Sequence, residues 1–449
     1  MKTTFTRRQF LRRSTLAGAS VLILRDSRLA FGAEANSRLN LAAIGVAGQG
    51  GSNLDNFAKL PTNIVALCDV DQAHAAGTFK KFPQAKRFQD FRRMLDQVGR
   101  EVDAVVVSTP DHTHAVAAVA AMKLGKHVYC EKPLARTVHE ARVMRETALK
   151  QKVVTQMGNQ GSASNGLRRA VEFVWQGAIG EVREAHIWFG GGNGPQTRPA
   201  DRPPVPPTLD WDLWLGPAPQ RPYNPCYLPG KWRDWRAFGS GIVGDFGCHT
   251  GNLMFQALRL EQLWNFAGGP SPKRLLVRVE AKPSEVNAEG YPTSMVAHVE
   301  MPAHGVLPSV KLHLFARVKP PADLLLGYPS GDWGDLLIGS KGRIYSDCPW
   351  NTRYVLLPED QYKDVKGGPP QTIPTSKGHH AEWVDACQGR GQPFSSFAIG
   401  GPLTELMQLV NLATLVEGPV EYDTVSGMVT NSPAANELVR RDYRSGWKL

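Results

Sequence analysis

Short apolar runs alternate with helix-length segments in the chain that follows residue 38. The apolar runs cover residues 39–44, 64–68, 103–108, 127–130 and 152–157. Helices are predicted at 113–124, which is rich in alanine, and at 137–150. Buried parallel strands are nearly continuous apolar runs, and helices connect them. The alternation therefore predicts a doubly wound parallel sheet of the α/β class.

The chain from residue 159 onward has a less regular pattern. A helix is expected at 166–176 and a strand at 181–189. Residues 195–219 contain eight prolines, which exclude a regular helix or a central strand there. Further helices are expected from residue 378 and at 403–416. This part of the chain therefore differs in architecture from the α/β part.

The first strand-like run leads into a glycine-rich turn. Gly45, Gly48 and Gly50 lie in this turn, and alanine takes the middle position of the Gly-x-Gly-x-x-Gly register, so that Gly48 is expected to give the close approach. The second run ends in Asp69. Strand, glycine turn, helix, strand and acid follow the order of a Rossmann unit, in which the helix N-terminus faces the pyrophosphate and the acid faces the ribose. We predict a Rossmann domain over 38–158 that binds NAD rather than NADP, since a carboxylate there repels a 2′-phosphate.

Two polar segments follow the third and fourth strand-like runs. Their candidate cofactor-binding residues are Ser108, Thr109, Pro110, His112, His114, Glu131 and Lys132. Ligands of open α/β sheets bind at the carboxyl ends of the strands. Both segments are therefore expected beside the cofactor.

A second motif combines an acid and a histidine after a glycine-rich stretch. Asp245 and His249 are four residues apart, so that in a helical turn they share one face. A histidine near a carboxylate is suited to acid/base chemistry, although a capping pair has the same spacing. From the residues alone both interpretations stay open.

The sequence Cys130-Glu131-Lys132-Pro133-Leu134, together with the polar segment upstream, closely resembles the Gfo/Idh/MocA family, typified by glucose-fructose oxidoreductase and inositol dehydrogenase. The resemblance covers nearly all of the chain after residue 36. It implies that Lys132 lies beside the nicotinamide and the substrate hydroxyl. It also implies that His249 takes the hydroxyl proton while hydride leaves the carbon, and that Asp245 orients or charges that group.

The same resemblance implies a second α+β domain over 159–449 with an open, mostly antiparallel sheet. One face of that sheet covers the nicotinamide end of the cofactor, and the other commonly forms a subunit interface, so that a homo-oligomer is expected. The substrate is expected to be a carbohydrate. The closing segment, 431–447, resembles a Tat-exported branch of the family.

Tryptophans cluster within and after the proline-rich segment. They are Trp211, Trp214, Trp232 and Trp235. Indoles stack on the apolar faces of sugar rings, but they also anchor loops to a core, and we expect one or two to meet the ligand. In related enzymes a histidine near the helix at 378 reaches the active site, which makes His379 or His380 a candidate.

Other chemistries have less support. The candidate metal ligands His112, His114, His249, His379 and His380 lack zinc spacing with a third partner, so that no metal is expected. No G-x-S-x-G element supports hydrolysis by a serine triad. Two alternatives stay open. One is an NAD-dependent glycoside hydrolase, whose extra base is sought among Tyr223, Tyr227 and His379, and the other is a cofactor-binding protein without turnover.

The N-terminus has the pattern of an export signal. Arg7-Arg8 precede an apolar stretch at 16–24 and the sequence Ala33-Glu34-Ala35, which predicts a Tat-type signal over 1–36 and a periplasmic or otherwise exported protein. Export of a folded protein implies a tightly bound cofactor. This segment also holds seven basic and two acidic residues of a chain with net charge +11. The remaining charge is mild and no basic stripe is present, so that nucleic-acid binding is not expected. No apolar run is long enough for a stable membrane span.

Overall fold

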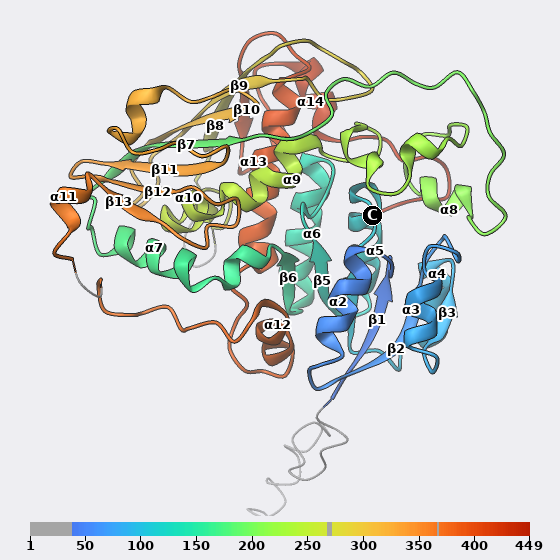
Figure 1. Cartoon of the computed structure of the whole chain (residues 1–449). Helices are drawn as coiled ribbons and strands as arrows, with labels where there is room; N and C mark the ends of the chain where they lie inside the picture. Colours follow the sequence, from blue (N-terminus) through green and yellow to red (C-terminus); the bar gives the residue numbers. More distant parts are fainter. Residues whose placement is uncertain (1–37, 267–271, 366–367) are drawn as a thin grey trace, which may run out of the picture. The chain divides into compact units, whose positions relative to one another are not determined.

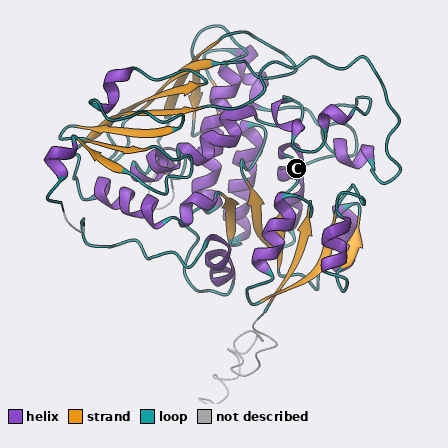
Figure 2. Ribbon diagram, in the orientation of Figure 1, coloured by secondary structure: helices purple, strands orange, loops and turns teal. Residues whose placement is uncertain are grey.

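The computed structural model describes residues 38–266, 272–365 and 368–449, which form two β-sheets and the helices around them (Figures 1 and 2). The predicted export signal at 1–36 lies outside the described residues. Within the described ranges, no helix combines the length and apolar character that crossing a membrane requires.

The first sheet is parallel, with the strand order β3-β2-β1-β4-β5-β6 of a Rossmann unit. Its strands are β1 (Leu39–Ile44), β2 (Thr62–Cys68), β3 (Lys86–Phe88), β4 (Ala104–Val107), β5 (His127–Glu131) and β6 (Thr155–Gly158). Its helices are α2 (Gln49–Phe57), α3 (Ala76–Lys81), α4 (Phe91–Val98), α5 (Asp111–Lys123) and α6 (Val138–Gln151). This sheet confirms the predicted fold class.

Alternate residues of the central strand explain why the runs are continuously apolar. Leu41 and Ala43 of β1 belong to a core cluster with residues of α2, whereas Ala42 and Ile44 belong to a second cluster with residues of α4 and α5. Successive side chains of a strand point to opposite faces. Both faces of the sheet are therefore buried under helices.

The second sheet has nine strands in the order β13-β12-β11-β7-β10-β9-β8-β14-β15. All neighbours are antiparallel except β7 and β10, which are parallel. Its strands are β7 (Val182–Phe189), β8 (Leu276–Pro283), β9 (Met295–Met301), β10 (Val310–Ala316), β11 (Gly334–Gly339), β12 (Arg343–Ser346), β13 (Val355–Leu357), β14 (Val420–Asp423) and β15 (Met428–Val429). The expected mostly antiparallel sheet is thus confirmed.

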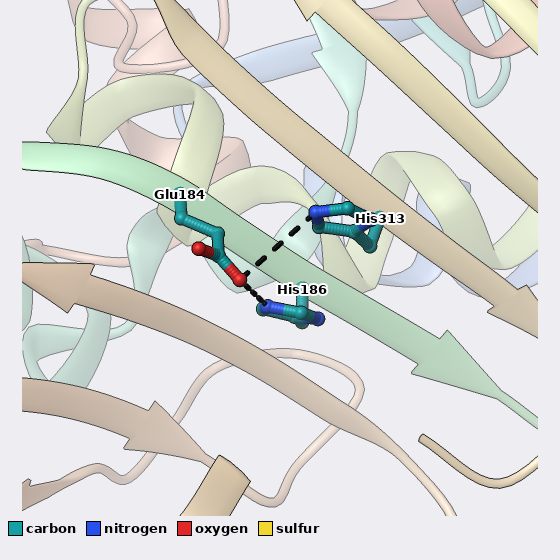
Figure 3. A group of neighbouring side chains, drawn as sticks. All are labelled: Glu184, His186 and His313. Atoms are coloured by element: carbon teal, nitrogen blue, oxygen red, sulfur yellow. Dashed lines mark hydrogen bonds and ion pairs between the residues drawn. The ribbon is translucent and has the colours of Figure 1, made fainter. Parts of the chain in front are cut away.

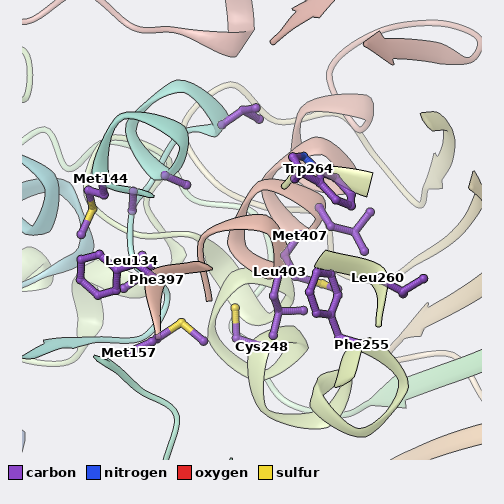
Figure 4. Close-up of a cluster of buried hydrophobic side chains, with 14 of the residues drawn as sticks. Leu134, Met144, Met157, Cys248, Phe255, Leu260, Trp264, Phe397, Leu403 and Met407 are labelled. Atoms are coloured by element: carbon purple, nitrogen blue, oxygen red, sulfur yellow. The ribbon is translucent and has the colours of Figure 1, made fainter. Parts of the chain in front are cut away.

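The remaining helices follow β6 in the chain, and one of them lies between the two sheets. They are α7 (Asn165–Trp175), α8 (Trp211–Leu215), α9 (Gly241–Thr250), α10 (Asn252–Ala257), α11 (Glu359–Tyr362), α12 (His379–Cys387), α13 (Phe397–Ala413) and α14 (Pro433–Val439). Helix α13 packs against α6, α9 and β8, and so lies between the sheets (Figure 1). Its Leu403 and Met407 share one core with Met144 of α6, Met157 of β6 and Cys248 of α9 (Figure 4). This continuous core fixes α9 relative to the end of β5.

The proline-rich segment forms loop apart from the five-residue helix α8. Its tryptophans and the aromatic residues after it form a separate apolar cluster that includes Trp214, Tyr227, Trp235 and Phe238. The segment is therefore held by its own small core.

Candidate active site

A cavity of about 730 Å³ lies at the carboxyl ends of β1, β2, β4 and β5 and extends to α9. Most candidate site residues line it: Gly45, Gly48, Asp69, Ser108, Thr109, Pro110, His114, Glu131, Lys132, Trp232, Asp245 and His249. Five others are not among the described residues that line it: Gly50, His112, Trp211, Trp235 and His379. The size is that of a cofactor and small-molecule site.

The glycine turn presents bare backbone to the cavity. Gly48 has φ +52°, and a Cβ added there would meet no atom within 4 Å, so that this position faces open space. Gly45 has φ +75°, and a Cβ there would lie 2.7 Å from the carbonyl oxygen of Ser108. At Gly50 a Cβ would collide with the carbonyl of Gly45. Gly48 thus leaves open space beside the turn, while Gly45 and Gly50 keep the turn tight.

Asp69 is fixed at the end of β2. Its Oδ2 accepts a hydrogen bond from the backbone N–H of Val46 (2.9 Å), and its Oδ1 accepts one from that of Asp71 (3.0 Å). Burial raises the pKa of this carboxyl group, because the charged form loses solvation. The group lines the cavity beside the glycine turn and still has lone pairs for hydroxyl donors.

Lys132 and Asp245 form an ion pair across the cavity wall. Lys132 follows β5, and its Nζ contacts Oδ1 of Asp245 on α9. A second cation, Arg233, lies with its Nε 3.3 Å from Oδ2 of the same carboxylate. The Lys132 ammonium also lies 5.7 Å from the ring centre of Phe246. One carboxylate thus holds two cations at the cavity surface.

The partners of His249 determine which ring nitrogen can accept a proton. Its Nδ1 lies 2.8 Å from Oδ1 of Asn159, whose Nδ2 donates to the carbonyl of Cys248 (2.7 Å). Because the amide oxygen is an acceptor, Nδ1 of His249 carries the proton and Nε2 carries the lone pair. Burial, with a smaller effect of Lys132, lowers the pKa of His249 well below its usual range. The ring is therefore a neutral base.

This arrangement differs from the role that the resemblance implies for Asp245. Asp245 and His249 do share α9, as the spacing predicts. The hydrogen bond that orients His249, however, comes from Asn159, whereas Asp245 pairs with Lys132 and Arg233. Asp245 therefore positions the cations rather than the imidazole.

The carboxylate of Glu131 lines the cavity and is hydrogen-bonded to side-chain amides. Its Oε1 accepts hydrogen bonds from Asn53 Nδ2 (2.9 Å) and Gln160 Nε2 (3.3 Å). His380 lines the cavity, and its Nε2 lies 3.0 Å from Oδ1 of Asn53. The neighbouring His379 is buried below the wall and does not line it. His380 is thus the histidine of α12 that is placed at the site.

The two histidines of α5 connect loops. Nε2 of His112 lies 2.9 Å from the carbonyl of Trp214, and burial lowers the pKa of this ring to about 3. His114 bridges the two strand-end segments, since its nitrogens lie 2.8 Å from the carbonyl of Thr109 and 2.9 Å from that of Pro133. Both rings fix the cavity walls, and only His114 lines the cavity.

The tryptophans divide into two groups. Trp214 and Trp232 line the cavity, together with Trp350, which sequence reasoning missed and which is 43% exposed. Trp211 stacks on Trp214 with ring centres 4.7 Å apart, and Trp235 is buried in the aromatic cluster. Trp232 and Trp350 are available to a ligand, whereas Trp211, Trp214 and Trp235 pack in the cluster that holds the loop.

Three further polar residues of the site were not among the candidates predicted from the sequence. Arg233 and Asn159 contact Asp245 and His249, and Asp111 lines the cavity at the start of α5. Burial raises the pKa of Asp111 to about 7, so that this carboxyl group exchanges a proton near neutral pH. Asp111 sits inside the polar segment that the sequence singled out, which is the only hint of its place.

Two family models match the chain. Residues 39–159 match the oxidoreductase family model with an NAD-binding Rossmann fold, and residues 188–256 match the C-terminal alpha/beta domain model of the same family. These ranges contain Lys132, Asp245 and His249. Both models are named for Gfo/Idh/MocA.

Curated relatives share shorter stretches. A levoglucosan dehydrogenase of Pseudarthrobacter phenanthrenivorans is 29% identical over 116 residues, which is 26% of this chain and 29% of that protein. A glycosyl hydrolase family 109 protein of Solibacter usitatus is 36% identical over 154 residues, 30% of this chain and 34% of that protein. The chain thus aligns with about a third of the length of these relatives.

A solved structure shows the same fold over most of the chain. The aldose-aldose oxidoreductase of Caulobacter crescentus, complexed with glycerol, has a TM-score of 0.57 at 18% identity, and the match covers 86% of this chain and 99% of that one. The Rossmann sheet, the second sheet and both family models lead to one conclusion: the chain belongs to the Gfo/Idh/MocA oxidoreductase family.

Proposed function

We propose that the protein transfers hydride between a hydroxyl-bearing carbon of a carbohydrate and a tightly bound nicotinamide cofactor. The observation that carries this proposal is the neutral His249, whose Nδ1 is occupied by Asn159 while the ring lines the same cavity as Lys132 and the glycine turn. A base and a cation beside a nucleotide cavity are the groups that alcohol oxidation requires.

The residues of the cavity fit a dinucleotide. Gly48 leaves room for a pyrophosphate against the start of α2, where the helix dipole favours anions. The Asp69 carboxylate suits the hydroxyl groups of an adenosine ribose and repels a 2′-phosphate, which favours NAD over NADP.

The chain's own residues supply the proton chemistry. Nε2 of His249 takes the hydroxyl proton as the carbon–oxygen double bond forms, and the Lys132 ammonium stabilises the developing negative charge on that oxygen. A nicotinamide bound in this cavity would supply the acceptor for the hydride that leaves the carbinol carbon. Asp245, which also pairs with Arg233, keeps the ammonium at this place.

A carbohydrate substrate is supported by the cavity wall and by the names of the relatives. Trp232 and Trp350 offer indole surface to sugar C–H faces. One relative is a levoglucosan dehydrogenase, and one structural neighbour is an aldose-aldose oxidoreductase. In the latter type of reaction a second carbonyl compound re-oxidises the cofactor, which then has no need to leave.

A second function is favoured by Asp111. A glycosidase that oxidises a sugar, eliminates the substituent, adds water and returns the hydride needs one more acid/base group. Asp111 lines the cavity, and burial raises the pKa of its carboxyl group to about 7. Two relatives are named glycosyl hydrolase family 109 proteins. This route leaves no net redox change.

The absorbance of the purified protein near ~340 nm, the band of reduced nicotinamide, tests these functions. A lasting change on adding a sugar supports the oxidoreductase. Release of free sugar from a glycoside without a lasting change supports the hydrolase. Absence of both, with cofactor present, leaves a cofactor-binding protein.

Asp69→Ala is expected to weaken NAD retention and to relax the rejection of NADP, because the hydroxyl acceptor and the charge that repels a 2′-phosphate are both removed. The rate of the chemical step at saturating NAD stays largely unchanged. Cofactor released from denatured protein measures retention, and titration with both dinucleotides measures selectivity. Unchanged preference for NAD in the variant contradicts the role of Asp69.

Export through the Tat pathway and a homo-oligomeric state remain part of the proposal. The twin arginines at positions 7 and 8 support the first, and the open sheet supports the second. Cell fractionation tests the export. Light scattering of the purified protein tests the oligomer, and a monomer mass at micromolar concentration contradicts it.

A further inference from the structure

Histidines and a glutamate gather on the face of the second sheet that points away from the main core. On β7, Glu184 and His186 alternate with Ala185 and Ile187, which belong to the main core. His313 of β10 pairs directly with His186 in the parallel register, and His298 of β9 pairs with His313. Glu184, His186, His298 and His313 therefore share this outer face.

Three of these side chains converge on a small volume (Figure 3). Nε2 of His186 lies 2.6 Å from Oε1 of Glu184, and Nε2 of His313 lies 4.0 Å from the same oxygen. All three atoms lie within 4.8 Å of one another. In a tetrahedral zinc site with bonds of about 2.0–2.1 Å, neighbouring ligand atoms are about 3.3 Å apart. Small side-chain rotations are therefore enough to reach that geometry.

The hydrogen bond of His313 suits coordination through its Nε2, whereas on binding zinc His186 would exchange the Nε2–H that it donates to Glu184 for the metal. His298 and His313 meet through their Nδ1 atoms at 2.7 Å. Two neutral imidazoles make this bond only when one Nδ1 donates, and when His313 donates, its Nε2 carries the lone pair. Such a contact to the second nitrogen orients metal-binding histidines.

We propose that Glu184, His186 and His313 bind one Zn²⁺ on the outer face of the second sheet, with His298 as a positioning residue. Two imidazoles and one carboxylate are ligands that zinc accepts, and three protein ligands leave one position for water. The Glu184 side chain is 44% exposed, so that the ion has access from solvent. The ion joins β7 to β10, the one parallel pair among the strands described in this sheet.

This site is separate from the proposed hydride chemistry. None of its four residues lines the 730 Å³ cavity, so that the expectation of metal-free catalysis is not affected. The site could not be predicted from the sequence, because Glu184 and His186 lie far from His313 along the chain and the strand register brings them together.

Zinc binding by the full chain tests the proposal. After chelation and desalting, the wild type is expected to bind about one equivalent of Zn²⁺ per chain. Co²⁺ in its place is expected to give the visible absorption of a tetrahedral complex. His313→Ala and Glu184→Gln are expected to lose this binding, and His298→Ala to weaken it about 10- to 100-fold. His304→Ala, which removes a histidine from the turn between β9 and β10, is the matched control and keeps it.

Glu184→Gln keeps a side chain of the same shape at an exposed position, so that the test does not depend on the folding of the histidine variants. Equal zinc binding by the wild type, Glu184→Gln and His313→Ala overturns the proposal, as does a wild type that retains no zinc. NAD content, measured in the same samples, is expected to be the same with and without zinc.

Discussion

His249→Ala is expected to lower the single-turnover rate by about 10² to 10⁴, which is the usual contribution of a positioned acid/base group. The substitution removes the nitrogen that takes the hydroxyl proton. It leaves the glycine turn and Asp69 untouched, so that NAD content stays near that of the wild type. Rapid-mixing absorbance with saturating cofactor measures the rate, and circular dichroism checks the fold.

The acid side of the pH profile gives a second readout for His249. Burial keeps its pKa well below 6.5, so that the ring stays an unprotonated base on lowering the pH through the usual histidine range. The wild-type rate is therefore expected to fall only below pH 6.5, where His249 gains its proton. Asn159→Asp places a carboxylate beside Nδ1, which favours the charged ring, and is expected to move this fall to higher pH.

His304→Ala serves as the control, because its ring lies in the turn after β9 and does not line the cavity. A His249 variant that turns over at the wild-type rate excludes this residue as the base. A profile that is the same in Asn159→Asp and the wild type excludes Asn159 as the residue that sets the protonation of His249.

The apolar pattern was enough to predict the first sheet, for a physical reason. Strands such as β4 are buried on both faces and so appear as continuous apolar runs. Such a run can be recognised without knowing which side chains it packs against. The short elements α3 and β3, of six and three residues, have too few positions to show a period. The second sheet buries Ala185 and Ile187 in the main core on one face and Trp188 and Leu336 in a smaller cluster on the other. Its existence was implied by family resemblance rather than by pattern.

The site residues that could be predicted from the sequence are those that lie together in short motifs. Lys132 and His249 belong to compact motifs, and Asp245 falls on the same helix as His249 because four residues make about one turn. The partners of these residues could not be predicted. Asn159 meets His249 across 90 positions of sequence, and such contacts depend on how α9 packs against the segment after β6.

The tryptophans illustrate the same limit. Their number in and after the proline-rich segment indicated a ligand wall or an anchor, and the structure contains both. Trp235 packs against Tyr227 with ring centres 4.8 Å apart, while Trp232 lines the cavity. Two indoles three residues apart in sequence thus have different environments, one at the cavity and one in the aromatic cluster.

Lys132→Ala is the substitution with the other large expected effect. It removes the ammonium that faces the developing oxyanion, and the loss of one such preorganised group typically costs about 10² to 10³ in rate. The variant is expected to fold, because Asp245 keeps Arg233 with its Nε at 3.3 Å and is not left as an unpaired buried charge. NAD content is expected to stay near the wild-type value.

Asp245→Asn is the comparison variant. It tests whether the position of the Lys132 ammonium matters as well as its presence. The amide keeps the shape of the side chain but loosens its hold on Lys132 and Arg233, so that both cations remain while their positions become less defined. Its rate is expected to lie between those of Lys132→Ala and the wild type. The measurement is the single-turnover rate together with the cofactor stoichiometry of each variant.

A Lys132→Ala protein that turns over normally once NAD is supplied in excess, but purifies without it, places Lys132 in cofactor binding instead of catalysis. An Asp245→Asn protein slower than Lys132→Ala shows that Asp245 acts on more than the ammonium, with Arg233 as the remaining partner to test.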